Sequence, residues 1–88
     1  MKKVFDYYTD PGHGWVKVPM NILKRLNIQE KITGHSYWRK GFAYLEEDCD
    51  MATLINAHPE KKLLKFNTHN SNKSSRIRNY ESYKIELA

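Results

Sequence analysis

Alternating apolar and polar residues predict most of the strands in this chain. Residues 3–8 and 15–18 are rich in β-branched and aromatic side chains, which favour strands. Pro11 and two glycines between them mark a tight turn, so these two strands are expected to pair as a hairpin. Residues 63–66 read as a further strand. Residues 82–87 alternate between polar and apolar, as in a half-buried closing strand.

Residues 35–47 carry the strongest hairpin signal, because two aromatic-rich runs flank a short basic turn that contains a glycine. Side chains alternate along a strand, so Phe42 and Tyr44 face one side of the second run, while Ala43 and Leu45 face the other. Apolar groups on both faces have two explanations. Either this strand lies at the centre of the sheet, or one face is an aromatic platform for a ligand. The sequence leaves both open.

Apolar residues at helical spacing predict two short helices. The first begins at Pro19, whose missing N–H would be unpaired in the first turn anyway, and Asn27 is expected to cap its C-terminal end. The second follows the acidic residues 46–50, where Asp48 or Asp50 can cap it, and stops before Pro59. The residues expected in the core are Leu23, Leu26, Leu45, Leu54 and Ile55.

These elements give the order ββαββαββ in a single domain spanning residues 1–88. We therefore predict an α+β fold with a mostly antiparallel sheet and two short helices on one face. Residues 67–79 are rich in Ser, Asn and basic side chains. This stretch is predicted to be a flexible basic loop before the last strand.

Composition narrows the functional classes. A chain of 88 residues has room for one modest core. No apolar run approaches the roughly 20 residues that a bilayer span needs, and the N-terminus lacks the apolar core of a signal peptide. The single cysteine, Cys49, suits a reducing cytoplasm. We therefore expect a cytoplasmic protein that does not associate with a membrane.

The net charge of +5 is unevenly placed. Residues 57–79 hold six lysines and arginines against Glu60 alone, and the remaining residues nearly cancel. A concentrated basic segment indicates phosphate or an acidic protein surface as partner, although a plain solvated face would have the same composition.

No group of residues has the spacing that catalysis requires, so we predict that the protein is not an enzyme and has no catalytic residues and no cofactor. The histidines are scattered, without zinc-ligand spacing. The carboxylates of residues 46–50 offer oxygen ligands for Mg²⁺ or Ca²⁺ but match no loop motif, and helix capping explains Asp48 and Asp50. Whether they bind a metal stays open, and no metal site is predicted.

Two partial resemblances point to nucleic acid. Residues 40–45, Lys-Gly-Phe-Ala-Tyr-Leu, resemble the start of the RNP1 pattern of RNA-recognition motifs, which implies aromatic residues that stack on bases. Residues 15–47, with Val-Pro before a short helix and a hairpin after it, resemble the strand-helix-strand unit of AbrB/MazE-type transcription regulators. That resemblance implies an interleaved dimer that binds DNA.

A third resemblance spans nearly the whole chain. The stretches 7–15 (Tyr-Tyr-Thr-Asp-Pro-Gly-His-Gly-Trp), 44–50 (Tyr-Leu-Glu-Glu-Asp-Cys-Asp) and 75–80 (Ser-Arg-Ile-Arg-Asn-Tyr) resemble a small family of uncharacterised proteins from phages and bacterial mobile elements. The resemblance implies a setting in which small proteins often bind and block a host or defence factor.

We therefore predict a small, non-enzymatic binding protein, an accessory protein of a phage or mobile element that occupies a host or defence macromolecule. The alternative is a domain that binds DNA or RNA directly, with phosphates on the basic segment and bases on the aromatic hairpin. The identity of the partner and the oligomeric state are left open. The residues predicted to contact nucleic acid or a partner are Tyr37, Trp38, Arg39, Lys40, Phe42, Tyr44, Lys61, Lys62, Lys65, Lys73, Arg76 and Arg78.

Overall fold

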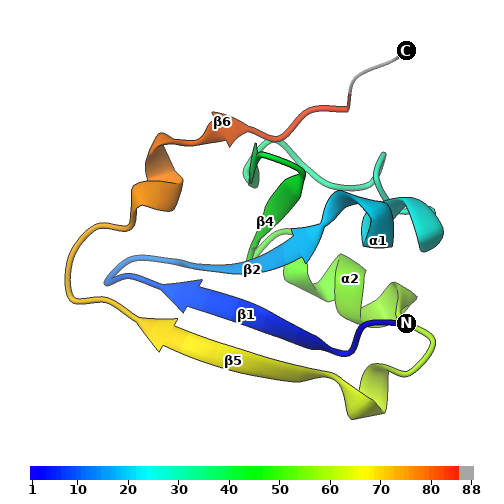
Figure 1. The fold of residues 1–88 in the computed structure, drawn as a ribbon. Coiled ribbons are helices and arrows are strands. Elements are labelled where there is room, and N and C mark those ends of the chain that lie inside the picture. Colours follow the sequence, from blue (N-terminus) through cyan, green and yellow to red (C-terminus); the bar gives the residue numbers. More distant parts are fainter. Residues whose placement is uncertain (86–88) are drawn as a thin grey trace.

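One six-stranded sheet organises the protein in the computed structural model, which describes residues 1–85 (Figure 1). Neither helix within these residues is long or apolar enough to cross a membrane. The elements in chain order are β1 (Val4–Thr9), β2 (Gly14–Pro19), α1 (Met20–Arg25), β3 (Tyr37–Arg39), β4 (Phe42–Glu46), α2 (Met51–Ala57), the 3-10 helix η1 (Lys61–Leu63), β5 (Lys65–Asn70), the 3-10 helix η2 (Arg76–Asn79) and β6 (Glu81–Ser82).

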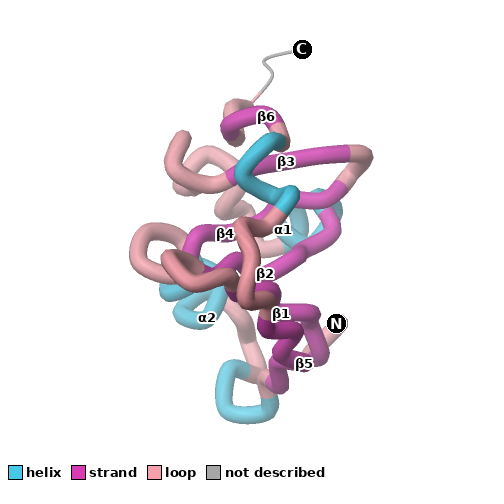
Figure 2. The backbone as a smooth tube through the Cα atoms, turned by 90° about the vertical axis from the view of Figure 1, so that its left-hand side faces the viewer, coloured by secondary structure: helices cyan, strands magenta, loops and turns pink. Residues whose placement is uncertain are grey.

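The strands lie in the order β5-β1-β2-β4-β3-β6, which Figure 2 shows from β6 at the top to β5 at the bottom. The α+β class is confirmed, but the sheet is mixed, because β5 runs parallel to β1. After β4 the chain crosses through α2 and η1 to the far side of β1, and a crossover of this kind brings strands together in parallel. The predicted element order is also incomplete, because it lacks η1 and η2.

The closing strand is shorter than predicted. Only β6 pairs with β3, and the chain leaves the sheet at Tyr83. The Tyr83 N–H makes a last backbone hydrogen bond to the Ser36 carbonyl at 2.8 Å. The ring of Tyr83 is buried, and its hydroxyl donates to the carbonyl of Gln29, so the side chain belongs to the core. Leu87, which the alternating pattern also placed in this strand, lies outside the described residues.

Both helices pack on one face of the sheet, because their buried side chains share a single cluster with the inward residues of the strands. Of the five residues predicted in the core, Leu23, Leu45 and Leu54 are fully buried, while Leu26 and Ile55 are half-buried. The strands supply Phe5, Val16, Val18, Ala43 and Leu45, and the helices supply Ile22, Leu23 and Leu54.

Two local conformations follow from residue type. Lys40 and Gly41 form the turn between β3 and β4, and their φ angles of 49° and 85° are those of a type I′ hairpin turn. Asn27 has a φ of 57° just after α1. Its N–H donates to the Lys24 carbonyl, and the next N–H donates to the Leu23 carbonyl, which together form a Schellman cap. The predicted capping role of Asn27 is confirmed.

The segment predicted as a loop, 67–79, is largely regular. Residues 67–70 belong to β5, and residues 76–79 form η2, which leaves 71–75 as the irregular connection. Ile77 is only 3% exposed and packs η2 against the sheet. The flexibility of this segment stays a prediction.

Replacing Leu54 by alanine is expected to lower the free energy of unfolding by roughly 2–5 kcal/mol, because a cavity would open in a fully buried part of the core. Leu63→Ala is the control: Leu63 is 55% exposed, and its truncation should change stability by less than about 0.5 kcal/mol. Urea unfolding followed by circular dichroism measures both. Equal losses for the two variants would contradict the described core.

Candidate functional site

The face of the sheet opposite the helices is aromatic. Trp15, Tyr44 and Ile77 form a second buried cluster there, and Phe42 and Tyr80 pack against it with part of their surface exposed. Of the two explanations of the aromatic strand, the central position is confirmed, and a ligand-binding role of the aromatic face stays a prediction. The strand β4 is central, between β2 and β3. Its outer face is an aromatic platform on which Tyr80 already covers Tyr44, with ring centroids 5.0 Å apart.

An open cavity of about 580 Å³ lies where the β3–β4 turn meets the chain leaving η2. Its volume is within the range typical of small-ligand sites, roughly 300–1,000 Å³. The cavity joins the predicted hairpin residues to a part of the chain about forty residues further on. Its lining includes Trp38, Arg39, Lys40 and Phe42 from the hairpin, and Tyr80 and Glu81 from the segment after η2.

Cations lie against the aromatic rings of this surface. The Lys17 Nζ is 4.3 Å from the centroid of the Phe42 ring, and the Arg39 Cζ is 5.1 Å from that of Tyr80. Lys40 is exposed at the tip of the turn. Cation–π contact keeps each charge beside a ring without neutralising it, so the surface combines apolar planes with positive charge.

The same face continues across β1 and β5. The ring of Tyr8 stacks on the His69 imidazole with centroids 4.8 Å apart and planes 18° from parallel. Burial raises the pKa of the Tyr8 and Tyr44 hydroxyls above the ordinary value. Both phenols therefore stay protonated at neutral pH, and they add hydrogen-bonding groups without adding negative charge.

Only part of the predicted contact set comes together here. Arg39, Lys40 and Phe42 line the cavity. Trp38 also lines it, although its ring packs against Tyr83 in the main core, with centroids 5.5 Å apart. Tyr37 instead packs edge-on against Trp15.

The predicted basic residues are dispersed. Lys61 and Lys62 lie in η1, and Lys65 is the first residue of β5, the edge strand on the far side of the sheet from β3. Lys73 lies in the connection after β5. Arg76 is exposed on η2, near Tyr8, whose pKa its charge lowers slightly against the larger effect of burial. The segment 57–79 is therefore basic in sequence without forming one basic patch.

Two residues of the site were missed from the sequence. Lys17 lies between Val16 and Val18, and strand alternation places its side chain on the face opposite the core. That alternation was visible, but the register pairing β2 with β4 was not. Tyr80 follows a stretch predicted as a loop, and nothing local indicated that it would return to the sheet.

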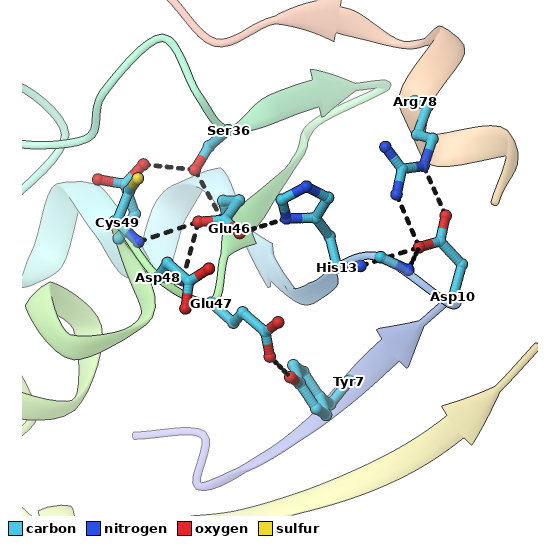
Figure 3. A network of polar contacts seen from close by, with 11 residues as sticks. Tyr7, Asp10, His13, Ser36, Glu46, Glu47, Asp48, Cys49 and Arg78 are labelled. Carbon is cyan, nitrogen blue, oxygen red and sulfur yellow. Dashed lines mark hydrogen bonds and ion pairs between the residues drawn. The ribbon is translucent and has the colours of Figure 1, made fainter. Parts of the chain in front are cut away.

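A network of polar contacts fixes the chain beside this face (Figure 3). The buried carboxylate of Asp10 accepts two hydrogen bonds from the Arg78 guanidinium, at 2.6 and 2.8 Å, and others from the N–H groups of Gly12, His13 and Ser75. The Arg78 hydrogen bonds, together with those from the backbone, hold the pKa of the Asp10 carboxyl well below its ordinary value despite burial. Arg78, predicted as a phosphate contact, is engaged in this ion pair.

A second part of the network surrounds Glu46 in Figure 3. One oxygen contacts the His13 Nδ1 at 3.0 Å, and the other accepts from the N–H groups of Asp48 and Cys49. Burial raises the pKa of Glu46, but these hydrogen bonds outweigh it and leave the pKa lowered. Desolvation and the nearby carboxylates raise the pKa of the Cys49 thiol, which disfavours a nucleophilic role.

The acidic residues 46–50 are largely occupied by the chain itself. The ligand atoms of His13, Glu46 and Asp48 lie within 4.8 Å of one another, so these residues could hold a metal ion, but both Glu46 oxygens already have partners. Asp50 stands at the N-cap position, directly before α2, but its side chain makes no capping hydrogen bond. Its carboxylate instead accepts hydrogen bonds from Thr33 and Ser36 in the loop before β3.

Comparison of this chain with protein-family models, with curated proteins and with solved structures found no match. The resemblances noted in the residue patterns stay predictions. Function has to be inferred from the surface itself.

Replacing Asp10 by asparagine tests the ion pair through pH. A carboxyl whose pKa is lowered by folding stabilises the protein above its unfolded pKa, about 3.9, and this contribution is lost as pH falls. The unfolding free energies of the wild type and Asp10→Asn should therefore differ most near neutral pH and converge below about pH 4. Asp48→Asn, at an exposed carboxylate, is the control. A pH-independent difference for Asp10→Asn would contradict this account.

Proposed function

We propose that this protein is a small, non-enzymatic binding protein that takes single-stranded nucleic acid on the helix-free face of its sheet. The observation that supports the proposal most is the open cavity lined by Phe42, Tyr80 and Arg39, in which Arg39 lies against the Tyr80 ring. Beside it, Lys17 lies against the Phe42 ring. Bases can stack on aromatic rings while neighbouring cations meet the phosphates, and this combination is the usual basis of single-strand binding.

Geometry favours an unpaired strand over a duplex. Phe42 and Tyr80 offer flat rings that a base can cover, whereas bases in a duplex expose only their edges in the grooves. Arg39 and Lys40 lie at the rim, where a backbone passing over the rings would run. The net charge of +5 favours polyanions in general. We propose neither a preferred base nor a preference between DNA and RNA.

In the proposed mechanism the protein acts by occupying the strand that it binds. A bound strand is covered by the sheet face and the segment after η2, and no step of bond making or breaking is involved. In the phage or mobile-element setting suggested by the residue patterns, such binding would deny a host or defence factor access to its nucleic acid. A direct protein target of the same kind remains the competing proposal for this surface.

Affinity for a labelled single-stranded oligonucleotide is expected to fall with added salt, because bound cations release condensed counterions. Lys40→Asn should reduce the slope of log affinity against log salt by about 0.7, the value for one phosphate contact on a single strand. Asn-Gly is a preferred type I′ turn sequence, so this variant should keep the fold. Fluorescence anisotropy at several salt concentrations measures the slope.

Two further variants separate stacking from charge. Phe42→Leu keeps apolar bulk but removes the ring, and should weaken binding by about 1–3 kcal/mol per lost base stack. Lys73→Ala removes an equal charge away from the cavity and should leave the salt slope nearly unchanged. Equal effects of Lys40→Asn and Lys73→Ala, tighter binding of duplex, or no binding at low salt would overturn the proposal.

A further inference from the structure

The strand β5 has a free outer edge. It pairs only with β1, and within residues 1–85 no other strand lies beyond it, as Figures 1 and 2 show. The N–H groups of Lys65 and Ser71 donate to β1 and its flanks. Because N–H and C=O groups alternate sides along a strand, those of the intervening residues Phe66, Thr68 and Asn70 point away from β1.

This edge lacks the features that usually prevent strand addition. It is six residues long, contains no proline, and carries one charged side chain, Lys65, at its first position. Apart from the half-buried Phe66, its side chains are exposed. Protein edges are normally shortened, bulged, covered or protected by proline, because unpaired backbone groups recruit further strands.

Exposed apolar side chains gather where β5 begins. Among the described residues, the large hydrophobic side chains classed as exposed are Met1, Val4 and Leu63. Val4 is the register partner of Lys65, and Leu63 lies two residues before it. One end of the edge therefore offers apolar surface next to the unpaired backbone.

The positive charge at the start of β5 indicates which kind of partner would bind there. Lys2, Lys3, Lys61, Lys62 and Lys65 lie there, and Glu60, the acidic residue among them, forms an ion pair with Lys3 at 3.3 Å. A second copy pairing through its own β5 would bring no complementary charge, because residues 61–79 contain no Asp or Glu. The other edge strand of a second copy, β6, carries Glu81 but is only two residues long, too short to cover the six residues of β5. A long acidic segment of a different chain therefore fits this edge better.

We propose that the outer edge of β5 binds an extended acidic segment of a partner protein by strand addition. Main-chain hydrogen bonds form at Phe66, Thr68 and Asn70, acidic side chains of the segment lie toward the lysines, and an apolar side chain contacts Leu63. Edge strands recognise peptides in this way: main-chain hydrogen bonds provide the affinity, and side-chain contacts provide the selectivity. This surface is separate from the cavity beside the β3–β4 turn and does not depend on the nucleic-acid proposal.

The test uses two synthetic peptides of alternating threonine and valine, one ending in glutamates and one in lysines, added to the isotope-labelled full chain. The acidic peptide should slow amide hydrogen exchange of Phe66, Thr68 and Asn70 and bind more tightly than the basic one. Thr68→Pro removes an outward N–H without losing a bond to β1, and should weaken binding roughly tenfold, whereas Thr68→Ala should not.

Two more measurements keep the result decisive. If Thr68→Pro fails to fold, an acidic peptide N-methylated at alternate residues takes its place, because it lacks the donors that strand addition needs. Lys61→Glu with Lys62→Glu should abolish the preference between the two peptides, because the remaining lysines are then balanced by three glutamates. Unchanged binding to Thr68→Pro or to the methylated peptide, equal binding of the acidic and basic peptides, or no binding would overturn the proposal. Oligonucleotide binding, measured separately on Thr68→Ala, tests only the cavity beside the β3–β4 turn and not the edge of β5.

Discussion

The buried ion pair of Asp10 and Arg78 is the contact on which the aromatic face depends. It joins the turn after β1 to η2, residues 68 apart in the chain. A buried charge is costly unless its hydrogen bonds are satisfied, and here three backbone N–H groups and a guanidinium satisfy the carboxylate. This pair holds η2 over the sheet, so that Ile77 is buried and Tyr80 reaches Tyr44. Together with the burial of Ile77 and the pairing of β6 with β3, the ion pair fixes the position of Tyr80 in the wall of the cavity.

Because side chains alternate along each strand, the two faces of the sheet have different roles. In β2, Val16 and Val18 face the helices, and the residue between them, Lys17, faces Phe42. In β4, Ala43 and Leu45 are fully buried against the helices. The same short strands thus build the core with one set of side chains and a charged aromatic surface with the other. Stability and surface chemistry are therefore encoded by adjacent residues.

Local features were predictable from the sequence, and contacts between distant segments were not. The hairpin around Lys40-Gly41 and the cap at Asn27 each rest on the conformational preference of one or two residues. Pro19, predicted as the first helical residue, instead ends β2, and α1 begins one residue later at Met20. The parallel position of β5 depends on which edge of the sheet is free when the chain returns. The pairing of Asp10 with Arg78 likewise brings together two residues that no local pattern connects, and for this reason the place of Tyr80 in the site was missed.

The parallel pairing of β1 with β5 has a consequence for how the chain folds during synthesis. Their paired residues lie 61 positions apart, so β1 cannot complete its pairing until the chain has been made as far as residue 70. Contacts between such distant segments form slowly, because a long loop must close before any hydrogen bond is gained. Until then β1 is itself an edge strand. During synthesis the outer edge of β1, which is more hydrophobic than that of β5, is therefore exposed for a time to neighbouring nascent chains.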